Sequence, residues 1–470
     1  MLTVADIFEA LTSNRPIAPQ IISEATIDSR QVIPSSLFVA LKGENVDGHN
    51  FIAEAFKKGA RVALVETDFS SDFPTIDIKK SLLENQLPNF DDSFCILVEN
   101  TLIALQEIAK FWRRKLNVKV IGITGSVGKS TTKEIISEVV SQKYCTLKNI
   151  GNFNNEIGLP LSILRLNENH ERAVLEMGFY IPGEIRLLCD IAKPSIGVVT
   201  NVGAVHAERA GSLEAIAQGK AELIESLPAD GVAILNYDDP FVRAMSSKTQ
   251  ARVFYYGLDP IADLWADEIE GLGLQGIRFR LHYQDEMLHI RVPLIGRHSV
   301  HTVLRAVAVG LVENISWQEI IFSLQQGQSQ LRLAAVTIPS GALILDDTYN
   351  ASPDSVMAAL NLLDELQGKK WAVLGEMLEL GPYEKQGHEM VGVRAAQVVS
   401  RLITVGEKAR IIAESAGLAG LSQESISWVP TVSEAIQLLH GTLQQKDIVL
   451  IKGSHGLHMD QIVNALEIDS

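Results

Sequence analysis

The sequence predicts an α/β protein of three domains, the second and third of which contain parallel sheets. Its length of 470 residues corresponds, as a prior, to about three domains. Short apolar segments alternate with amphipathic helical segments along most of the chain, and this alternation is typical of βαβ units. In addition, one apolar segment leads directly through a glycine-rich turn into a helix.

The first domain is expected over residues 1–100 as a small α/β unit. Residues 36–41 and 61–66 have the apolar character of strands, and residues 50–60 between them have helical periodicity. The polar residues that follow, 67–93, predict a long loop.

The second domain is expected over residues 101–328, and it starts with a helix at 101–116. Its strands are expected at 118–125, 171–178, 195–202 and 231–237. Because helices alternate with these strands, beginning with one at 131–144, the sheet should be parallel.

The third domain is expected over residues 329–470. Its strands are expected at 341–348, 370–377, 401–407 and 446–454, and its helices at 387–400, 432–443 and 459–468. This repeated βαβ pattern predicts a C-terminal Rossmann-like domain.

Composition and charge argue against several classes of protein. The formal net charge of −16 argues against nucleic-acid binding, which depends on Lys and Arg contacts with phosphates. The three cysteines, Cys95, Cys145 and Cys189, lack the spacing of a disulfide framework or a zinc site, and suit a reducing cytoplasm. No signal peptide is evident, and no apolar run approaches the ~20 residues of a membrane-spanning helix. We therefore expect a cytoplasmic protein that does not insert into a membrane.

The segment "VKVIGITGSVGKSTTKE" (118–134) has the pattern of a phosphate-binding loop. Glycines allow backbone N–H groups to surround phosphate oxygens, and the following helix adds the positive end of its dipole. Lys129 would place a positive charge on the β- and γ-phosphates, and Ser130, with Thr131 next to it, would offer a hydroxyl group to Mg²⁺. The residues expected to bind the nucleotide are Gly125, Ser126, Val127, Gly128, Lys129, Ser130 and Thr131.

This loop departs from the strict pattern, because Ile123 occupies the position of the first glycine. An ordinary strand–helix turn is the alternative, but the flanking strand and helix favour ATP or GTP binding. The loop alone is compatible with a kinase, a GTPase switch, a motor protein or a ligase.

Lys220 lies in the middle of an apolar helix face, where a lysine is unusual. The apolar positions of this helix (212–227) are Leu213, Ile216, Ala217, Leu223, Ile224 and Leu227. The ordinary explanations are that the ammonium group reaches the solvent or pairs with Glu222.

The residues around the loop resemble the Mur ligase family of peptidoglycan precursor synthesis. Five segments resemble the family and occur in the same order as in its members. They are "GITGSVGKSTTKE", "GNFNNEIGLPL" (151–161), "LEMG" (175–178), "TNVGAVHAER" (200–209) and the segment around Lys220. Residues 28–60, 345–356 and 374–381 are similar to the family member that adds D-alanyl-D-alanine. The resemblance covers nearly the whole chain and implies a UDP-binding domain, a central P-loop ATPase domain and a Rossmann-like domain.

The resemblance implies an ATP-dependent amide ligase. Such an enzyme would phosphorylate the terminal carboxylate of UDP-N-acetylmuramoyl-tripeptide, and the amine of D-alanyl-D-alanine would attack the resulting acyl phosphate. The products would be the UDP-pentapeptide, ADP and phosphate. The family chemistry further implies two Mg²⁺ ions and a carbamylated Lys220. The protein is expected to be a monomer. A lysine in an apolar setting has a lowered pKa, so its neutral amine can add CO₂ and become an anionic oxygen ligand.

The resemblance also implies roles for individual residues. Catalysis is expected to involve Lys129, Asn155, Glu176, His206 and Lys220, with Asn152 near the phosphates. The metal ligands are expected to be Ser130, Glu176, His206 and Lys220. The third domain would contribute Arg332, Asp347, Tyr349 and Asn350 to the ATP site. The first domain would bind the UDP group through Ser29, Arg30, Lys42, Asp47 and His49.

Some positions depart from the family pattern. The segment "GRHSVHTVLRA" has Ser299 and His301 where many members have asparagines, so its adenine contacts are open. Ser352 replaces a common asparagine, and His455 stands where an arginine is frequent.

Two other functions remain as alternatives. Another Mur ligase would add a single amino acid to a UDP-muramoyl peptide, but the "DNPR"-type motif of the members that add meso-diaminopimelate is absent from this sequence. A nucleotide-binding regulatory switch would form no bond, and it would not need Glu176, His206 and Lys220 together.

Overall fold

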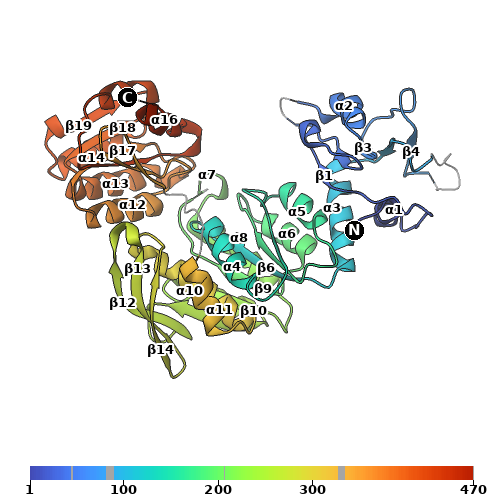
Figure 1. The fold of residues 1–470 in the computed structure, drawn as a ribbon, viewed down its shortest axis with the longest axis horizontal. Coiled ribbons are helices and arrows are strands. Elements are labelled where there is room, and N and C mark those ends of the chain that lie inside the picture. Colours follow the sequence, from blue (N-terminus) through green and yellow to red (C-terminus); the bar gives the residue numbers. More distant parts are fainter. Residues whose placement is uncertain (44–45, 81–88, 206, 327–333, 469–470) are drawn as a thin grey trace.

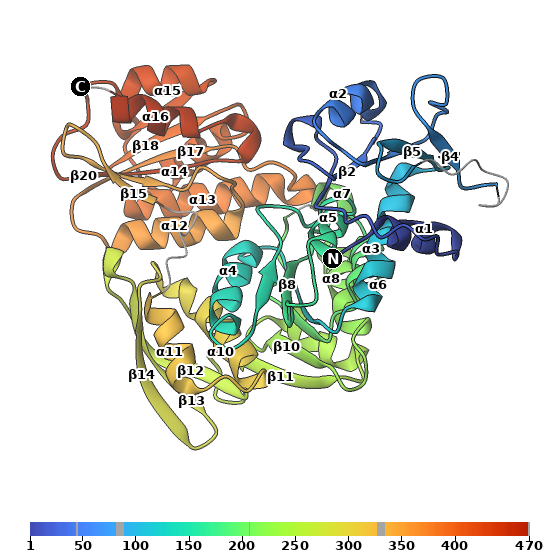
Figure 2. The ribbon, with the colours of Figure 1, turned by 45° about the vertical axis from the view of Figure 1, so that its right-hand side comes forward.

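The computed structural model describes residues 1–43, 46–80, 89–205, 207–326 and 334–468, and contains three separate sheets (Figure 1). The N-terminal sheet and the C-terminal sheet lie on either side of the central one (Figures 1 and 2). The predicted three-domain α/β class is confirmed. None of the described helices combines the length and the apolar character that a bilayer-spanning helix needs.

The first sheet is parallel and has the strand order β1-β2-β3-β5-β4. Its elements are α1 (Val4–Thr12), β1 (Ala25–Thr26), β2 (Leu37–Val39), α2 (Ile52–Lys57), β3 (Val62–Val65), β4 (Thr75–Asp77) and β5 (Phe94–Leu97). The predicted long loop at 67–93 therefore contains a short edge strand, β4, which hydrogen-bonding with β5 stabilises. Residues 81–88 of that loop lie outside the described residues.

The central sheet has the order β14-β13-β12-β11-β10-β9-β6-β8-β7. Its strands are β6 (Lys119–Thr124), β7 (Thr146–Lys148), β8 (Arg172–Glu176), β9 (Ile196–Val199), β10 (Val232–Asn236), β11 (Arg252–Gly257), β12 (Leu264–Gly271), β13 (Ile277–Tyr283) and β14 (Glu286–Val292). Its helices are α4 (Lys129–Val140), α5 (Gly158–Leu164), α6 (Glu184–Ala192), α7 (Ala207–Ala210), α8 (Leu213–Glu225), α9 (Pro240–Ala244), α10 (Val300–Val312) and α11 (Trp317–Gln326).

Only part of the central sheet is parallel as predicted. Strands β12, β13 and β14 form an antiparallel extension at one edge, which was not expected from the sequence. The alternation of buried and outward residues along β13 is the pattern of an antiparallel strand with one solvated face.

The third sheet has the order β15-β16-β20-β17-β18-β19 and is parallel except for the pair β15–β16. Its elements are β15 (Ala334–Thr337), β16 (Leu343–Asp346), α12 (Pro353–Glu365), β17 (Lys369–Gly375), α13 (Glu384–Val398), β18 (Arg401–Val405), α14 (Arg410–Leu418), β19 (Ile426–Val429), α15 (Val432–Leu439), β20 (Asp447–Lys452) and α16 (Asp460–Ile468). Helices α12 and α13 lie on the side that faces the central domain (Figures 1 and 2).

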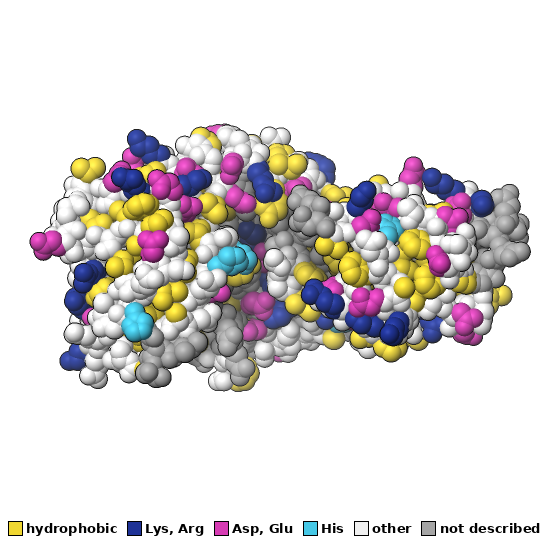
Figure 3. All heavy atoms as spheres, turned by 90° about the horizontal axis from the view of Figure 1, so that it is seen from above, with side chains coloured by type: hydrophobic (Ala, Val, Ile, Leu, Met, Phe, Trp, Pro, Cys, Tyr) yellow, Lys and Arg dark blue, Asp and Glu magenta, His cyan; other side chains and the backbone are white. Residues whose placement is uncertain are grey.

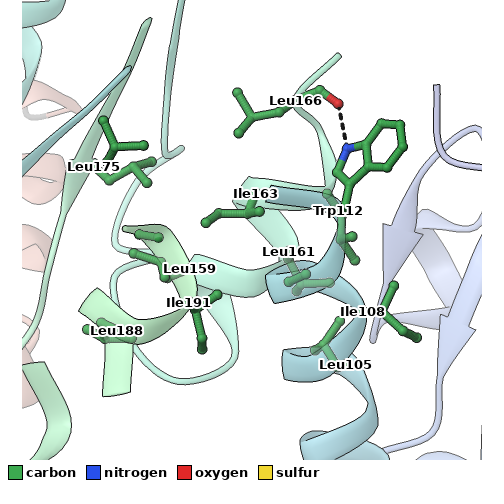
Figure 4. Close-up of a cluster of buried hydrophobic side chains, with 14 of the residues drawn as sticks. Leu105, Ile108, Trp112, Leu159, Leu161, Ile163, Leu166, Leu175, Leu188 and Ile191 are labelled. Carbon is green, nitrogen blue, oxygen red and sulfur yellow. Dashed lines mark hydrogen bonds between the residues drawn. The ribbon is translucent and has the colours of Figure 1, made fainter. Parts of the chain in front are cut away.

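The first two domains share one hydrophobic cluster, whereas the third has clusters of its own. Helix α3 (Thr101–Lys115) joins the first two domains and begins where Asn100 Oδ1 accepts from Ile103 N–H at 2.8 Å. Its buried side chains, including Trp112, meet α5 and α6 (Figure 4). Trp112 Nε1 donates to the Leu166 carbonyl at 2.9 Å. Seen from above, the first domain is a lobe joined to the rest by a narrow neck (Figure 3).

Arg113 fastens the end of α3 to the central domain. The side chain is 8% exposed, and its guanidinium donates to the carbonyl groups of Ala192, Leu116 and Val118. These carbonyls belong to the end of α6 and to the connection between α3 and β6. The arginine therefore satisfies buried backbone acceptors that have few alternatives.

We expect Arg113→Met to lower the stability of the protein by about 3 kcal/mol, because it leaves buried carbonyl groups without donors. The apparent melting temperature should fall by several degrees. Arg114→Met is the matched control, since Arg114 is the exposed neighbour on the same helix turn. Equal melting temperatures for the two variants would contradict the role given to Arg113.

Candidate functional site

The phosphate loop predicted from the sequence connects β6 to α4. Gly125 and Gly128 have φ angles of +144° and +81°, which favour glycine. A Cβ atom on Gly125 would lie 1.9 Å from Thr200 Oγ1, so no side chain fits there. Helix α4 begins at Lys129, two residues earlier than predicted, and its first turn therefore includes Ser130.

The loop that follows β9 holds the phosphate loop in place. Ser126 N–H donates to the Asn201 carbonyl at 3.0 Å, and Val127 N–H donates to Asn201 Oδ1 at 2.9 Å. Thr200 Oγ1 donates to the Val127 carbonyl at 2.7 Å. Strands β6 and β9 are neighbours in the sheet, so their carboxyl ends bring the two loops together.

Ser130 and Glu176 lie in direct contact. Ser130 Oγ donates to Glu176 Oε2 at 2.6 Å, and Glu176, which ends β8, is 3% exposed. Lys129 Nζ lies on the inner side of the loop, where it donates to the Gly125 carbonyl at 2.8 Å. A hydroxyl and a carboxylate side by side provide the hard oxygen donors that Mg²⁺ prefers.

The asparagine that reaches Glu176 is Asn154. Its Nδ2 donates to Glu176 Oε1 at 2.9 Å, while Asn149 exchanges two hydrogen bonds with the Glu176 backbone. Asn155 instead accepts from Gly158 N–H at 2.8 Å at the start of α5, and Asn152 is exposed. These asparagines are neighbours in one turn, so the sequence does not show which of them contacts Glu176. The backbone geometry of the turn decides it.

Lys220 is buried, with 1% of its surface exposed. Its Nζ lies 4.8 Å from the centre of the Phe179 ring, and Gly219 leaves room for that ring, since a Cβ there would lie 1.9 Å from Phe179 Cε2. Burial, and secondly the charge of Lys129, hold the pKa of the Lys220 amine well below its usual value. Neither ordinary explanation applies, because Lys220 does not reach the solvent and Glu222 accepts from the backbone N–H groups of Gly183 and Arg186.

The third domain faces the phosphate loop with the loop after β16. Asp347 Oδ2 lies 2.7 Å from Lys452 Nζ, and this ammonium also donates to the Asn350 carbonyl at 2.8 Å. Tyr349 is 41% exposed, with its ring 5.9 Å from that of His455. Lys452, which ends the buried strand β20, was not predicted as a site residue. A lysine in an apolar strand is nevertheless as unusual as Lys220 on an apolar helix face.

A cavity of about 460 Å³ lies between the second and third domains. Its lining includes Ser126 to Thr131, Glu176, Thr200, Asn201, residues of the segment 295–305, Asp347, Tyr349, Asn350 and Lys452. The cavity thus brings Lys129, Ser130 and Glu176 together with Asp347, Tyr349 and Asn350, whereas Asn155 and Lys220 are not part of its lining.

Three of the departures from the family pattern, Ser299, His301 and Ser352, also border this cavity. Ser299 Oγ donates to the Ile295 carbonyl at 2.7 Å, and His301 Nε2 lies 2.7 Å from Asp238 Oδ2. Ser352 caps α12 in a reciprocal arrangement with Ser355. Ser352 therefore performs the helix-capping role for which asparagine is equally suited.

The residues predicted to bind UDP follow neighbouring strands of the first sheet. Ser29 Oγ donates to Glu54 Oε2 at 3.2 Å, and the exposed Arg30 pairs with Asp28 at 2.7 Å. Lys42 and Asp47 form a backbone bridge, and Asp47 and His49 are 2.6 Å apart through Oδ1 and Nδ1. These segments come after β1 and β2, which are parallel neighbours, so they share one edge of the sheet.

Two predicted residues, His206 and Arg332, lie outside the described residues. Their placement relative to the site is therefore untested, and both remain predictions from the sequence.

Three family profiles match the chain. They are the Mur ligase family catalytic domain over residues 21–113, the Mur ligase middle domain over 123–310 and the Mur ligase glutamate ligase domain over 331–455.

Similar proteins share the full length of the chain. The UDP-N-acetylmuramoyl-tripeptide–D-alanyl-D-alanine ligase of Bacillus subtilis is 35% identical over 469 residues, covering 98% of this chain and 97% of that protein. The ligase of the same name from Escherichia coli is 30% identical over 474 residues, covering 99% and 98%. A crystal structure of MurF from Acinetobacter baumannii has a TM-score of 0.84 and 30% identity, and covers 98% of both chains. MurF ligase from Thermotoga maritima in complex with ADP has a TM-score of 0.80 and 27% identity, with 98% of both chains covered.

We expect Asn154→Ala to slow ATP turnover about 10-fold or more, because the Glu176 carboxylate loses a hydrogen bond beside Ser130. Asn155→Ala should instead lower stability by about 1 kcal/mol through the start of α5. Steady-state kinetics and thermal melting distinguish the two effects, with the exposed Asn169→Ala as control. The reverse result, slow turnover in Asn155→Ala alone, would restore the role that the sequence gave to Asn155.

Proposed function

Because the chain belongs to the Mur ligase family, we propose that it joins D-alanyl-D-alanine to UDP-N-acetylmuramoyl-tripeptide with ATP as the energy source. The observation that carries this proposal is the full-length similarity, across all three domains, to ligases named for that reaction. Identity of 30–35% over at least 98% of the chain leaves no domain unaccounted for.

The reaction proceeds in two steps. The terminal carboxylate of the tripeptide attacks the γ-phosphorus of ATP, so the bond to ADP breaks and an acyl phosphate forms. The amine of D-alanyl-D-alanine then attacks the acyl carbon, loses a proton and expels phosphate. The products are the UDP-pentapeptide, ADP and phosphate.

The phosphate loop and the third domain would hold ATP between them. The backbone of Gly125–Gly128 and the ammonium of Lys129 are suited to the phosphates, and the loop at Asp347–Asn350 borders the same cavity. Because the two walls come from different domains, their approach would exclude water from the acyl phosphate, which hydrolyses easily.

The donor set at the loop fits Mg²⁺. Ser130 and Glu176 supply adjacent oxygen atoms, and bound Mg²⁺ would offset negative charge on the phosphates. The chemistry of a second ion fits Lys220 only if its amine carries a carboxyl group, since an ammonium cannot coordinate a cation. His206 stays a predicted ligand.

We further propose that Lys220 is carbamylated. The lowered pKa of this buried amine supports the idea, because the neutral nitrogen can attack CO₂ and release one proton. The carbamate would turn a buried cation into an anionic oxygen donor.

We propose that the first domain binds the UDP group. Arg30 and Lys42 are exposed cations near the sheet edge where Ser29, Asp47 and His49 lie, and guanidinium groups bind phosphates bidentately.

The three cysteines are free thiols, which supports a cytoplasmic location.

We expect phosphate release from ATP only when both UDP-N-acetylmuramoyl-tripeptide and D-alanyl-D-alanine are present, because the acyl phosphate needs both the carboxylate and the amine. Mass spectrometry should identify the UDP-pentapeptide. Release that requires a single amino acid and a shorter precursor would assign the chain to another Mur ligase step. Release without any amine would support the regulatory switch.

We expect Lys220→Ala to lose ligation, because it removes the anionic ligand. Added CO₂ should not restore it, whereas a short carboxylic acid should restore part of the rate. Lys133→Ala is the matched control, since Lys133 is also 1% exposed but donates to the Asn149 carbonyl, so a carboxylic acid should not rescue it. Wild-type ligation by Lys220→Ala would remove the carbamate from the proposal.

A further inference from the structure

Arg305 is a buried cation in the cavity that the mechanism above does not use. It lies on α10, is 5% exposed and lines the cavity. Its Nη2 donates to Thr302 Oγ1 at 2.8 Å, and its Cζ lies 5.8 Å from the centre of the Tyr256 ring.

The guanidinium has more donors than the protein satisfies. Arg305 Nε is buried and finds no acceptor among the described residues. No ion pair joins the guanidinium to a carboxylate in the described part of the chain, and the nearest partners, Thr302 and Tyr256, are neutral. Arginine stays protonated in proteins even though burial lowers its pKa, so the charge persists. A buried charge without a counterion is costly, which makes a purely structural role a poor explanation.

Arg305 lies beside the phosphate loop. A Cβ atom built on Gly128 would lie 3.7 Å from Arg305 Nη2 and 3.9 Å from Nη1. The guanidinium therefore faces the bend of the phosphate loop from the side of α10. Lys129 Nζ occupies the inner side of the same loop, on the carbonyls of Gly125 and Ser126.

Two carboxylates near this end of the cavity, those of Asp238 and Asp239, already have partners. The carboxylate of Asp238 lies against His301, and Asp239 accepts from the N–H groups of Val202 and Phe241. An anion that enters the cavity would therefore meet Arg305 as a donor with unused N–H groups. A guanidinium with free, planar donors matches the oxygens of a phosphate.

We propose that Arg305 binds the phosphate chain of ATP and ADP, as a second fixed cation opposite Lys129. This inference rests on the proposed ATP-dependent function. Arg305 touches the nucleotide but takes no part in bond formation, so its effect is on the affinity and orientation of the phosphates.

Two properties of the Arg305→Met variant test this role. Its affinity for ATP and ADP should fall by about 10- to 100-fold, the loss typical of a charged hydrogen bond, while its affinity for adenosine changes less than about threefold. Calorimetry measures ATP and ADP, and competition with a fluorescent ATP analogue measures adenosine. The nucleotide-free variant should also melt at a higher temperature than the wild type, because the substitution removes a buried cation that has no counterion. Arg305→Lys keeps the charge and should retain an intermediate affinity.

Arg113→Met is the matched control, because Arg113 is a buried arginine whose guanidinium donates to three carbonyl groups. This control should melt at a lower temperature and bind ADP as the wild type does. Unchanged ADP affinity in Arg305→Met, an equal loss for adenosine, or a lower melting temperature of the empty variant would each overturn the proposal. If the wild type ligates its substrates normally, these outcomes refute only the role of Arg305. Failure of the wild type to ligate would refute the proposed function instead.

Discussion

The site depends on the adjacency of three parallel strands, β9, β6 and β8, whose carboxyl ends meet at one edge of the central sheet. The glycines of the phosphate loop have no side chains with which to hold its shape. The loop after β9 supplies that support through Thr200 and Asn201. The end of β8 supplies Glu176, which fixes the first hydroxyl of α4. Loss of this adjacency would leave the glycine residues without a defined conformation.

The same region concentrates positive charge in a protein whose net charge is −16. Lys129 and the buried Arg305 lie at the loop, although acidic and basic side chains are interspersed on the surface in Figure 3. A buried cation such as Arg305 lowers stability in the empty protein, and a bound polyanion would compensate for it. The arrangement is an example of stability given up for function.

Local patterns predicted the phosphate loop and singled out Lys220, because each signal is complete within a few residues, whereas the roles of Glu176 and Lys220 came from the resemblance to the family. That Asn154 rather than Asn155 contacts Glu176 depends on the backbone of one turn, which composition does not encode, and the catalytic role of Asn155 stays a prediction. Arg305 was missed because its significance comes from Gly128, a residue distant in sequence on another element. The antiparallel strands β12 to β14 were missed, although their residues alternate between buried and outward positions, because they directly follow a series of βαβ units.

The hydrophobic clusters divide the molecule into two units that should unfold separately. One cluster runs without interruption from the first domain into the second, whereas the clusters of the third domain contain only its own residues. The first two domains therefore form one cooperative block, and the third is a separate folding unit. Heat or denaturant should release the third domain independently, so a single free energy cannot describe unfolding of the whole chain. A bound nucleotide, which spans both units, would couple the two transitions into one.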